Sequence, residues 1–121
     1  MKTSIEFIQG DISQVVVDMT VNAAIGPITH GREKDVEQLA ACHLGCLDQA
    51  VEQGARSIAF PVISPGYPVA EASVIAVGAV HGWLLNHPDA LDRILFVLPD
   101  ARTLQAYRSA HQARGRRGRP Q

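Results

Sequence analysis

Three apolar segments constrain the fold of this chain more than any other feature. They span residues 15–21, 57–63 and 93–98, and each is continuous enough to form a strand buried on both faces. Helical patterns over residues 32–51 and 70–86 separate these segments along the chain. Because strands that alternate with helices pair in parallel, the sequence predicts an α/β domain whose largely parallel sheet is covered on both faces.

Shorter signals complete the predicted order of elements. Residues 4–9 favour an opening strand, and Gly54 suits the C-terminal cap of the first helix. Asp100 is expected to cap a final helix that turns Leu104 and Tyr107 inward. The first helix is expected to bury one face, formed by Val36, Leu39, Ala40, His43, Leu47, Ala50 and Val51.

Composition favours a single globular domain. The chain has 121 residues, of which 46% are hydrophobic and 19% are charged, and this argues against disorder. No apolar run reaches the roughly 20 residues of a membrane span, and no basic-then-apolar segment opens the chain. With two cysteines in the whole sequence, a reducing cytoplasm is the expected compartment.

Charge is distributed unevenly. Residues 1–101 carry five basic and twelve acidic side chains, whereas residues 102–121 carry six arginines and no acid. An acidic body is poorly suited to bind nucleic acid over a broad face. We therefore expect a domain over residues 1–112 and a basic, flexible tail over residues 113–121. The tail could contact RNA or other phosphates, but a solvated tail is the favoured interpretation.

Asp11 follows the first predicted strand and a glycine. Its carboxylate could accept a hydrogen bond from an exocyclic amine such as that of adenine. The alternative is a turn aspartate that bonds to its own backbone, and for this residue alone the alternative is favoured.

Two further segments lie where predicted strands end. Asn22, Ala23 and Ala24 follow the second strand, where small residues would let a ligand approach the backbone; tight packing of a strand end is an equal alternative. The loop 64–68 joins a strand to a helix, and backbone N–H groups there suit phosphate. Any strand-to-helix turn could have a similar sequence, and Pro65 removes one donor.

Cysteine and histidine give weaker signals. Cys42 and Cys46 are four residues apart on one predicted helix and could ligate a metal, but no second cluster completes the set, so buried thiols are favoured. His81 lies on an apolar helix face and is interpreted as a core residue. No catalytic arrangement of serine, cysteine, histidine and aspartate is recognisable, and we predict no catalytic residue, metal or cofactor.

Taken together, these segments resemble the macro domain family, nearest the branch of O-acetyl-ADP-ribose deacetylases and ADP-ribosyl hydrolases. The resemblance lies in residues 5–12, 17–24, 57–64 and 93–100, and it covers residues 4–112. It implies a three-layer α/β/α fold with a mostly parallel, mixed sheet. It also implies ADP-ribose or a related adenine nucleotide as ligand. The implied ligand-binding residues are Asp11, Ile12, Asn22, Ala23, Ala24, Ser64, Gly66 and Tyr67, with Asp11 and Ile12 at adenine.

The sequence also departs from the family pattern. Ile25 replaces a second asparagine, and Gly26-Pro27 follows at once where the family has a glycine-rich loop, a helix and further strands. That loop wraps the diphosphate and carries an aspartate implicated in catalysis. Pro99 stands where an aromatic residue often packs on adenine. We therefore expect a sheet with fewer strands, weak ligand binding and little or no hydrolysis.

Two alternatives remain. The loss of neighbouring strands should leave residues 15–21 at or near an open sheet edge, where two copies could pair as a homodimer with a degenerate pocket. Residual hydrolysis of ADP-ribosyl or O-acetyl-ADP-ribose substrates is the last alternative.

Overall fold

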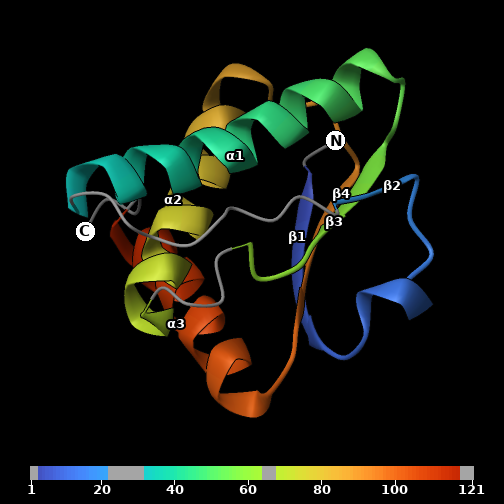
Figure 1. Cartoon of the computed structure of the whole chain (residues 1–121). Helices are drawn as coiled ribbons and strands as arrows, with labels where there is room; N and C mark the ends of the chain where they lie inside the picture. Colours follow the sequence, from blue (N-terminus) through green and yellow to red (C-terminus); the bar gives the residue numbers. More distant parts are fainter. Residues whose placement is uncertain (1–2, 22–31, 64–67, 118–121) are drawn as a thin grey trace.

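The fold is built on one parallel sheet. The computed structural model describes residues 3–21, 32–63 and 68–117. The strands are β1 (Ser4–Gln9), β2 (Met19–Thr20), β3 (Ser57–Phe60) and β4 (Arg93–Leu98), and the helices are α1 (Arg32–Glu52), α2 (Val69–Asn86) and α3 (Ala101–Arg117), with a short 3₁₀ turn η1 (Ile12–Gln14). The sheet order is β1-β4-β3-β2, and every pair is parallel (Figure 1). The predicted α/β class and parallel sheet are confirmed.

Aromatic rings join the sheet to the helices. Phe7, Phe96 and Phe60 lie in register across β1, β4 and β3, and neighbouring ring centroids are 5.3 and 5.5 Å apart. His43 of α1 and Tyr107 of α3 pack on this row. Buried residues of α2 belong to the same core, so all three helices lie on one face of the sheet (Figure 1).

The second face is covered differently. Ala59, Leu95 and Val97 form a small separate cluster, and Ile12, Val15 and Val17 pack against it. This covering comes from the segment between β1 and β2, so in the described residues the expected helix layer exists on one face and an irregular segment covers the other.

This packing also explains why the strand predicted over residues 15–21 is wrong for most of its length. Only Met19–Thr20 pairs in the sheet, and Val16 is 91% exposed. The Val15 N–H donates to Ile12 O at 3.2 Å, which closes η1 instead of pairing with a strand. The valines that alternate with Val16 cover the second face, so their apolar character comes from packing rather than from a continuous strand.

Other boundaries differ less. β3 stops at Phe60 because Pro61 has no N–H for a ladder bond. Within α1, Val36 and Val51 are 38% and 40% exposed, so the buried stripe is narrower than predicted. Gly54 has φ +78°, as its capping position requires. The helix α3 continues to Arg117, so residues 113–117 are helical where a tail was expected.

Among the described helices, α2 is long and apolar enough to cross a membrane, judged by length and composition alone. It packs between α1 and α3, and Ala76, Val77 and Val80 are buried in the core. One third of this apolar segment is buried in the structure.

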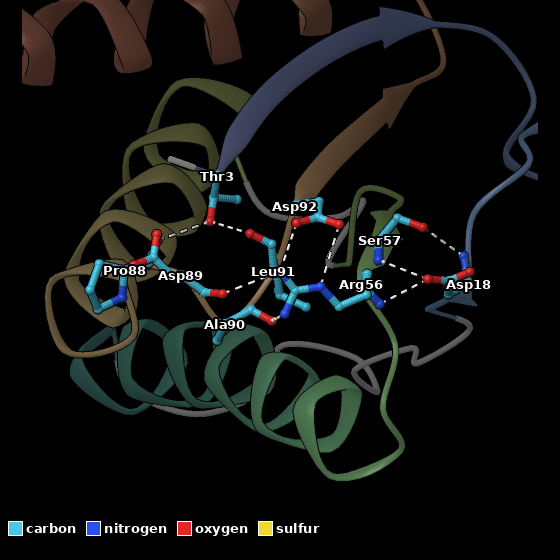
Figure 2. Close-up of polar contacts among 9 residues, drawn as sticks. All are labelled: Thr3, Asp18, Arg56, Ser57, Pro88, Asp89, Ala90, Leu91 and Asp92. Carbon is cyan, nitrogen blue, oxygen red and sulfur yellow. Dashed lines mark hydrogen bonds and ion pairs between the residues drawn. The ribbon is translucent and has the colours of Figure 1, made fainter. Parts of the chain in front are cut away.

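A polar network ties together the amino ends of the four strands (Figure 2). The Arg56 guanidinium donates to Asp92 Oδ1 at 2.6 Å and to Ala90 O at 2.8 Å, while Thr3 Oγ1 donates to Leu91 O at 2.6 Å. On the other side, Asp18 Oδ2 accepts the backbone N–H groups of Arg56 at 2.8 Å and Ser57 at 3.2 Å. Residues that precede each strand are thereby fixed relative to one another.

We predict that Asp18→Ala lowers the free energy of unfolding by about 1 kcal/mol, because two backbone donors lose their acceptor at a site that water still reaches. Asp18→Asn keeps an acceptor oxygen and should lose less. Urea unfolding followed by circular dichroism measures both, and an Asp18→Ala midpoint equal to wild type would contradict this role.

The buried imidazole of His43 predicts a pH-dependent stability. The His43 residue is 1% exposed; its Nδ1 lies 2.8 Å from Leu39 O, and its Nε2 has no hydrogen-bond partner among residues 3–21, 32–63 and 68–117. Burial lowers the pKa of His43 below the ordinary 6.5, against the opposing effect of the Leu39 carbonyl. The unfolded chain then binds more protons, so this contribution to stability is present above about pH 6.5 and is lost as pH falls below it.

His43→Leu should stay within about 1 kcal/mol of wild type at neutral pH, because it removes an unpaired buried nitrogen. It should also reduce the loss of stability between about pH 7.5 and 5. Part of that loss should remain, because the pKa values of His81 and His111 are lowered too. Leu47→Met is the control, since it perturbs the core without removing an ionisable group. Equal pH slopes for wild type and His43→Leu would refute the prediction.

Candidate functional site

The carboxyl ends of the four strands lie at the same end of the sheet, which we call the carboxyl edge. Gln9 pairs in register with Leu98, and Gly10 N–H donates to Leu98 O at 2.9 Å. On the other side of the sheet, Val21 N–H donates to Ala59 O at 3.0 Å. In parallel α/β sheets this edge is where ligands bind.

Asp11 is held at this edge by a local turn. Its Oδ1 accepts the backbone N–H of Ser13 at 2.9 Å and the Ser13 hydroxyl at 2.8 Å. These bonds lower the pKa of Asp11, so the exposed carboxylate is ionised at neutral pH. The turn interpretation is therefore confirmed. The second oxygen, Oδ2, has no partner among the described residues and can accept a donor from a ligand.

Ile12 fixes the position of that turn. Its side chain is half-buried and packs against the cluster of Ala59, Leu95 and Val97 on the second face of the sheet. Packing on strands β3 and β4 holds η1 at the end of β1, with Asp11 as its N-terminal cap. Asp11 and Ile12, which the family resemblance implies as adenine contacts, thus lie where β1 ends, on the side of the sheet where ligands are expected.

The remaining site residues lie outside the described residues. They are Asn22, Ala23, Ala24, Ser64, Gly66 and Tyr67. Val21 and Ile63, which precede these two segments in the chain, are each 2% exposed, so β2 and β3 lead into them from the core.

Asp100 occupies the N-terminus of α3 at the same edge. Its Oδ1 accepts the Thr103 N–H at 2.8 Å, as the predicted cap requires, and this bond lowers the pKa of Asp100. Because a carboxylate already occupies this helix end, it is unsuited to receive a phosphate.

Among the described residues, Cys42 and Cys46 belong to no set of metal ligands. Cys42 and Cys46 are half-buried, and burial raises the pKa of Cys46 to about 11, with a smaller contribution from Cys42. The Cys46 sulfur is therefore protonated at neutral pH. In the part of the chain that the structure describes, no group of three His, Cys, Asp or Glu side chains could hold a metal ion.

A histidine pair lies away from this edge and was not foreseen. His81 Nε2 of α2 is 3.0 Å from His111 Nδ1 of α3. His81 is half-buried rather than a full core residue. No local pattern could signal the pair, because its members are 30 residues apart and meet only when α2 and α3 pack.

Comparisons with known proteins agree with this architecture. A model of the Macro domain family matches residues 15–76, just over half of the chain. The O-acetyl-ADP-ribose deacetylase of Klebsiella pneumoniae is 39% identical over 105 residues, covering 84% of this chain and 57% of that protein. The ADP-ribose glycohydrolase MACROD1 of Bos taurus is 38% identical over 76 residues, covering 59% of this chain and 23% of that protein. The chain thus spans little more than half of the bacterial relative.

Solved structures show the same fold. A mutant macrodomain of Oceanobacillus iheyensis superposes with a TM-score of 0.83 at 19% identity, covering 92% of each chain. The Trypanosoma brucei macrodomain in complex with ADP-ribose gives a TM-score of 0.73 at 20% identity, covering 87% of this chain and 68% of that one. With its family match, parallel sheet and strand-end turn, this chain belongs to the macro domain family.

Proposed function

We propose that this chain is a reduced macro domain that binds ADP-ribose or a related adenine nucleotide weakly and does not hydrolyse it. The observation that carries the proposal is the Asp11 carboxylate, which is fixed through Oδ1 while Oδ2 has no partner in the described residues. A solved macrodomain with this fold was crystallised with ADP-ribose. We propose the cytoplasm as the compartment, in keeping with the two free cysteines.

This geometry supports the proposal that Asp11 and Ile12 recognise adenine. The ionised Asp11 is a strong acceptor, and the exocyclic amine of adenine is a donor without charge. The half-buried Ile12 side chain offers apolar surface beside it. In this proposal, phosphates would meet the turns at residues 22–24 and 64–66, which follow β2 and β3 in the chain, and Tyr67 is a further ligand-binding residue.

Weak affinity is proposed from the sequence. Gly26-Pro27 follows Asn22-Ala23-Ala24-Ile25 directly, so the glycine-rich loop that wraps the diphosphate in the family has no counterpart. Pro99 provides no aromatic surface for adenine. With these contacts missing, we expect a Kd of ~0.1 mM or weaker.

Absence of hydrolysis is proposed on similar grounds. Hydrolysis requires a held water and a group that orients or deprotonates it. The family segment that supplies its implicated aspartate is missing between Ile25 and Gly26. In this proposal Asp11 bonds to its turn through Oδ1 and to adenine through Oδ2, so it has no free oxygen with which to act as a general base.

We predict that Asp11→Ala weakens ADP-ribose binding at least tenfold, because a hydrogen bond to a charged acceptor is worth about 1.5–3 kcal/mol. Ser13→Ala is the matched control: it removes one turn contact but keeps the carboxylate, so its Kd should stay within about threefold of wild type. Isothermal titration calorimetry with ADP-ribose measures all three proteins.

No heat from wild type at millimolar ADP-ribose would refute binding. Equal affinity of Asp11→Ala and wild type would refute the role of Asp11. Release of ADP-ribose from an ADP-ribosylated protein by the pure wild-type chain would support the residual hydrolase alternative instead.

A second candidate function is a homodimer that forms at the β2 edge. In the described sheet, β2 pairs with β3 alone, and the adjoining Val16 is 91% exposed. An unpaired edge beside an exposed valine favours association with a second copy. The dimer could also supply a missing wall of the nucleotide site.

If residues 15–21 form this interface, light scattering should give the wild-type chain a dimer mass at high concentration and give Val16→Lys a monomer mass. Val74→Lys is the control, because Val74 is 58% exposed on α2 and distant from the β2 edge in sequence and fold. A wild-type chain that stays monomeric at every concentration would remove the dimer.

A further inference from the structure

A cavity lies beside the amino end of β1. It has a volume of about 490 Å³, within the ~300–1,000 Å³ range of small-molecule pockets. Ile5 of β1 and Leu84 and Leu85 of α2 give it apolar walls, and His81 and His111 are its ionisable lining residues. It lies at the opposite end of β1 from Asp11, so it is separate from the nucleotide site.

The histidine pair gives this pocket polar groups that the fold does not use. The two facing nitrogens are 3.0 Å apart and the ring centroids are 5.1 Å apart, so the rings meet nearly end to end in a hydrogen bond. This leaves His81 Nδ1 and His111 Nε2 without partners in the described part of the chain, and neither is sealed from water. In either tautomer, one of these outer nitrogens is a donor and the other an acceptor.

This end-to-end arrangement disfavours a metal ion. A metal bound by both rings needs the two nitrogen lone pairs to converge on a third point, whereas here the nitrogens face each other. No third ligand of a suitable type joins them among the described residues. The pair is better suited to hydrogen bonding with an organic ligand.

Local charge selects the sign of that ligand. Arg114 lies one helical turn beyond His111 on α3. Its guanidinium lies over Gly78 of α2, where an added Cβ would be 3.4 Å from Nη1. Its positive charge contributes to lowering the pKa of His81. No carboxylate pairs with Arg114 within the described residues. The histidine pair therefore offers one outward N–H donor, and Arg114 adds a positive charge one helical turn from His111.

We propose that this pocket binds a small monocarboxylate with an apolar body. The apolar chain would lie against Ile5, Leu84 and Leu85, and the carboxylate would accept a hydrogen bond from the one outer N–H of the histidine pair, with Arg114 one helical turn away. Leu85 is 83% exposed, so a ligand on this wall removes apolar surface from water. The nearby positive charge of Arg114 disfavours a cation, and a neutral ligand would gain nothing from that charge.

The experiment uses octanoate as the probe, with 1-octanol and octylammonium as matched ligands of different charge. Calorimetry on the full chain should show one saturable site for octanoate, at least tenfold weaker binding of octanol, and no binding of octylammonium. The His81 and His111 ring protons should shift in NMR spectra as the site fills. Octanoate should also bind unchanged when ADP-ribose is present, so this outcome does not depend on the nucleotide site.

Two exposed positions on α2 provide variants that leave the fold intact. Leu85→Glu places a carboxylate on the pocket wall and should weaken octanoate binding at least tenfold. Val74→Glu adds the same charge at a 58% exposed residue that does not line the pocket, and it should bind like wild type. Arg114→Gln should weaken binding severalfold. The proposal is overturned if octanoate fails to saturate a site by ~10 mM, if octanol binds as tightly, or if both glutamate variants lose binding equally.

Discussion

The parallel pairing of β4 with both β1 and β3 is the constraint on which the rest of the structure depends. It pairs Ser4 with Arg93, which are far apart in the sequence. The bidentate salt bridge between Arg93 and Glu6 joins the same two strands. Because the strands are parallel, the chain returns to the same end of the sheet before each new strand. All four strands therefore begin at one end of the sheet and finish at the opposite end. The Arg56 network joins the residues at the amino ends of the strands, and the Asp11 turn lies at their carboxyl ends.

The two faces of this sheet are covered unequally. Rings of Phe7, Phe96 and Phe60 carry three helices on one face, whereas Ile12, Val15 and Val17 cover the other. The second covering uses few residues, and through Ile12 it packs the Asp11 turn directly against the sheet. The position of Asp11 is therefore set by the packing of the residue that follows it, and Val16 is left in solvent as a consequence of the same alternation.

The proposed ligand sites differ in how the fold builds them. The nucleotide edge depends on loops that continue from strand ends, as in other parallel α/β folds. The histidine pocket depends on the packing of α2 against α3 and on the start of β1. One proposed site lies at strand ends and the other beside α2 and α3. A substitution at Leu85 therefore changes only the histidine pocket, and a substitution at Ser13 changes only the Asp11 turn.

The sequence by itself determined the elements whose signals are local. The helix ends at Glu52 and Asn86, the strand Arg93–Leu98, the Gly54 cap and the Asp100 cap all follow from hydrophobic period or capping chemistry within a few residues. The strand-end turn at Asp11 was predicted for the same reason. Tertiary structure decided what depends on distant partners. Residues 15–18 look like a strand because apolar β-branched residues suit both a buried strand and a segment that covers a sheet. Only the packing of Val15 and Val17 on the second face of the sheet selects between these. The histidine pair and the Arg56 network likewise join residues about 30 or more positions apart, so no local pattern encodes them, and only the packed fold brings them together.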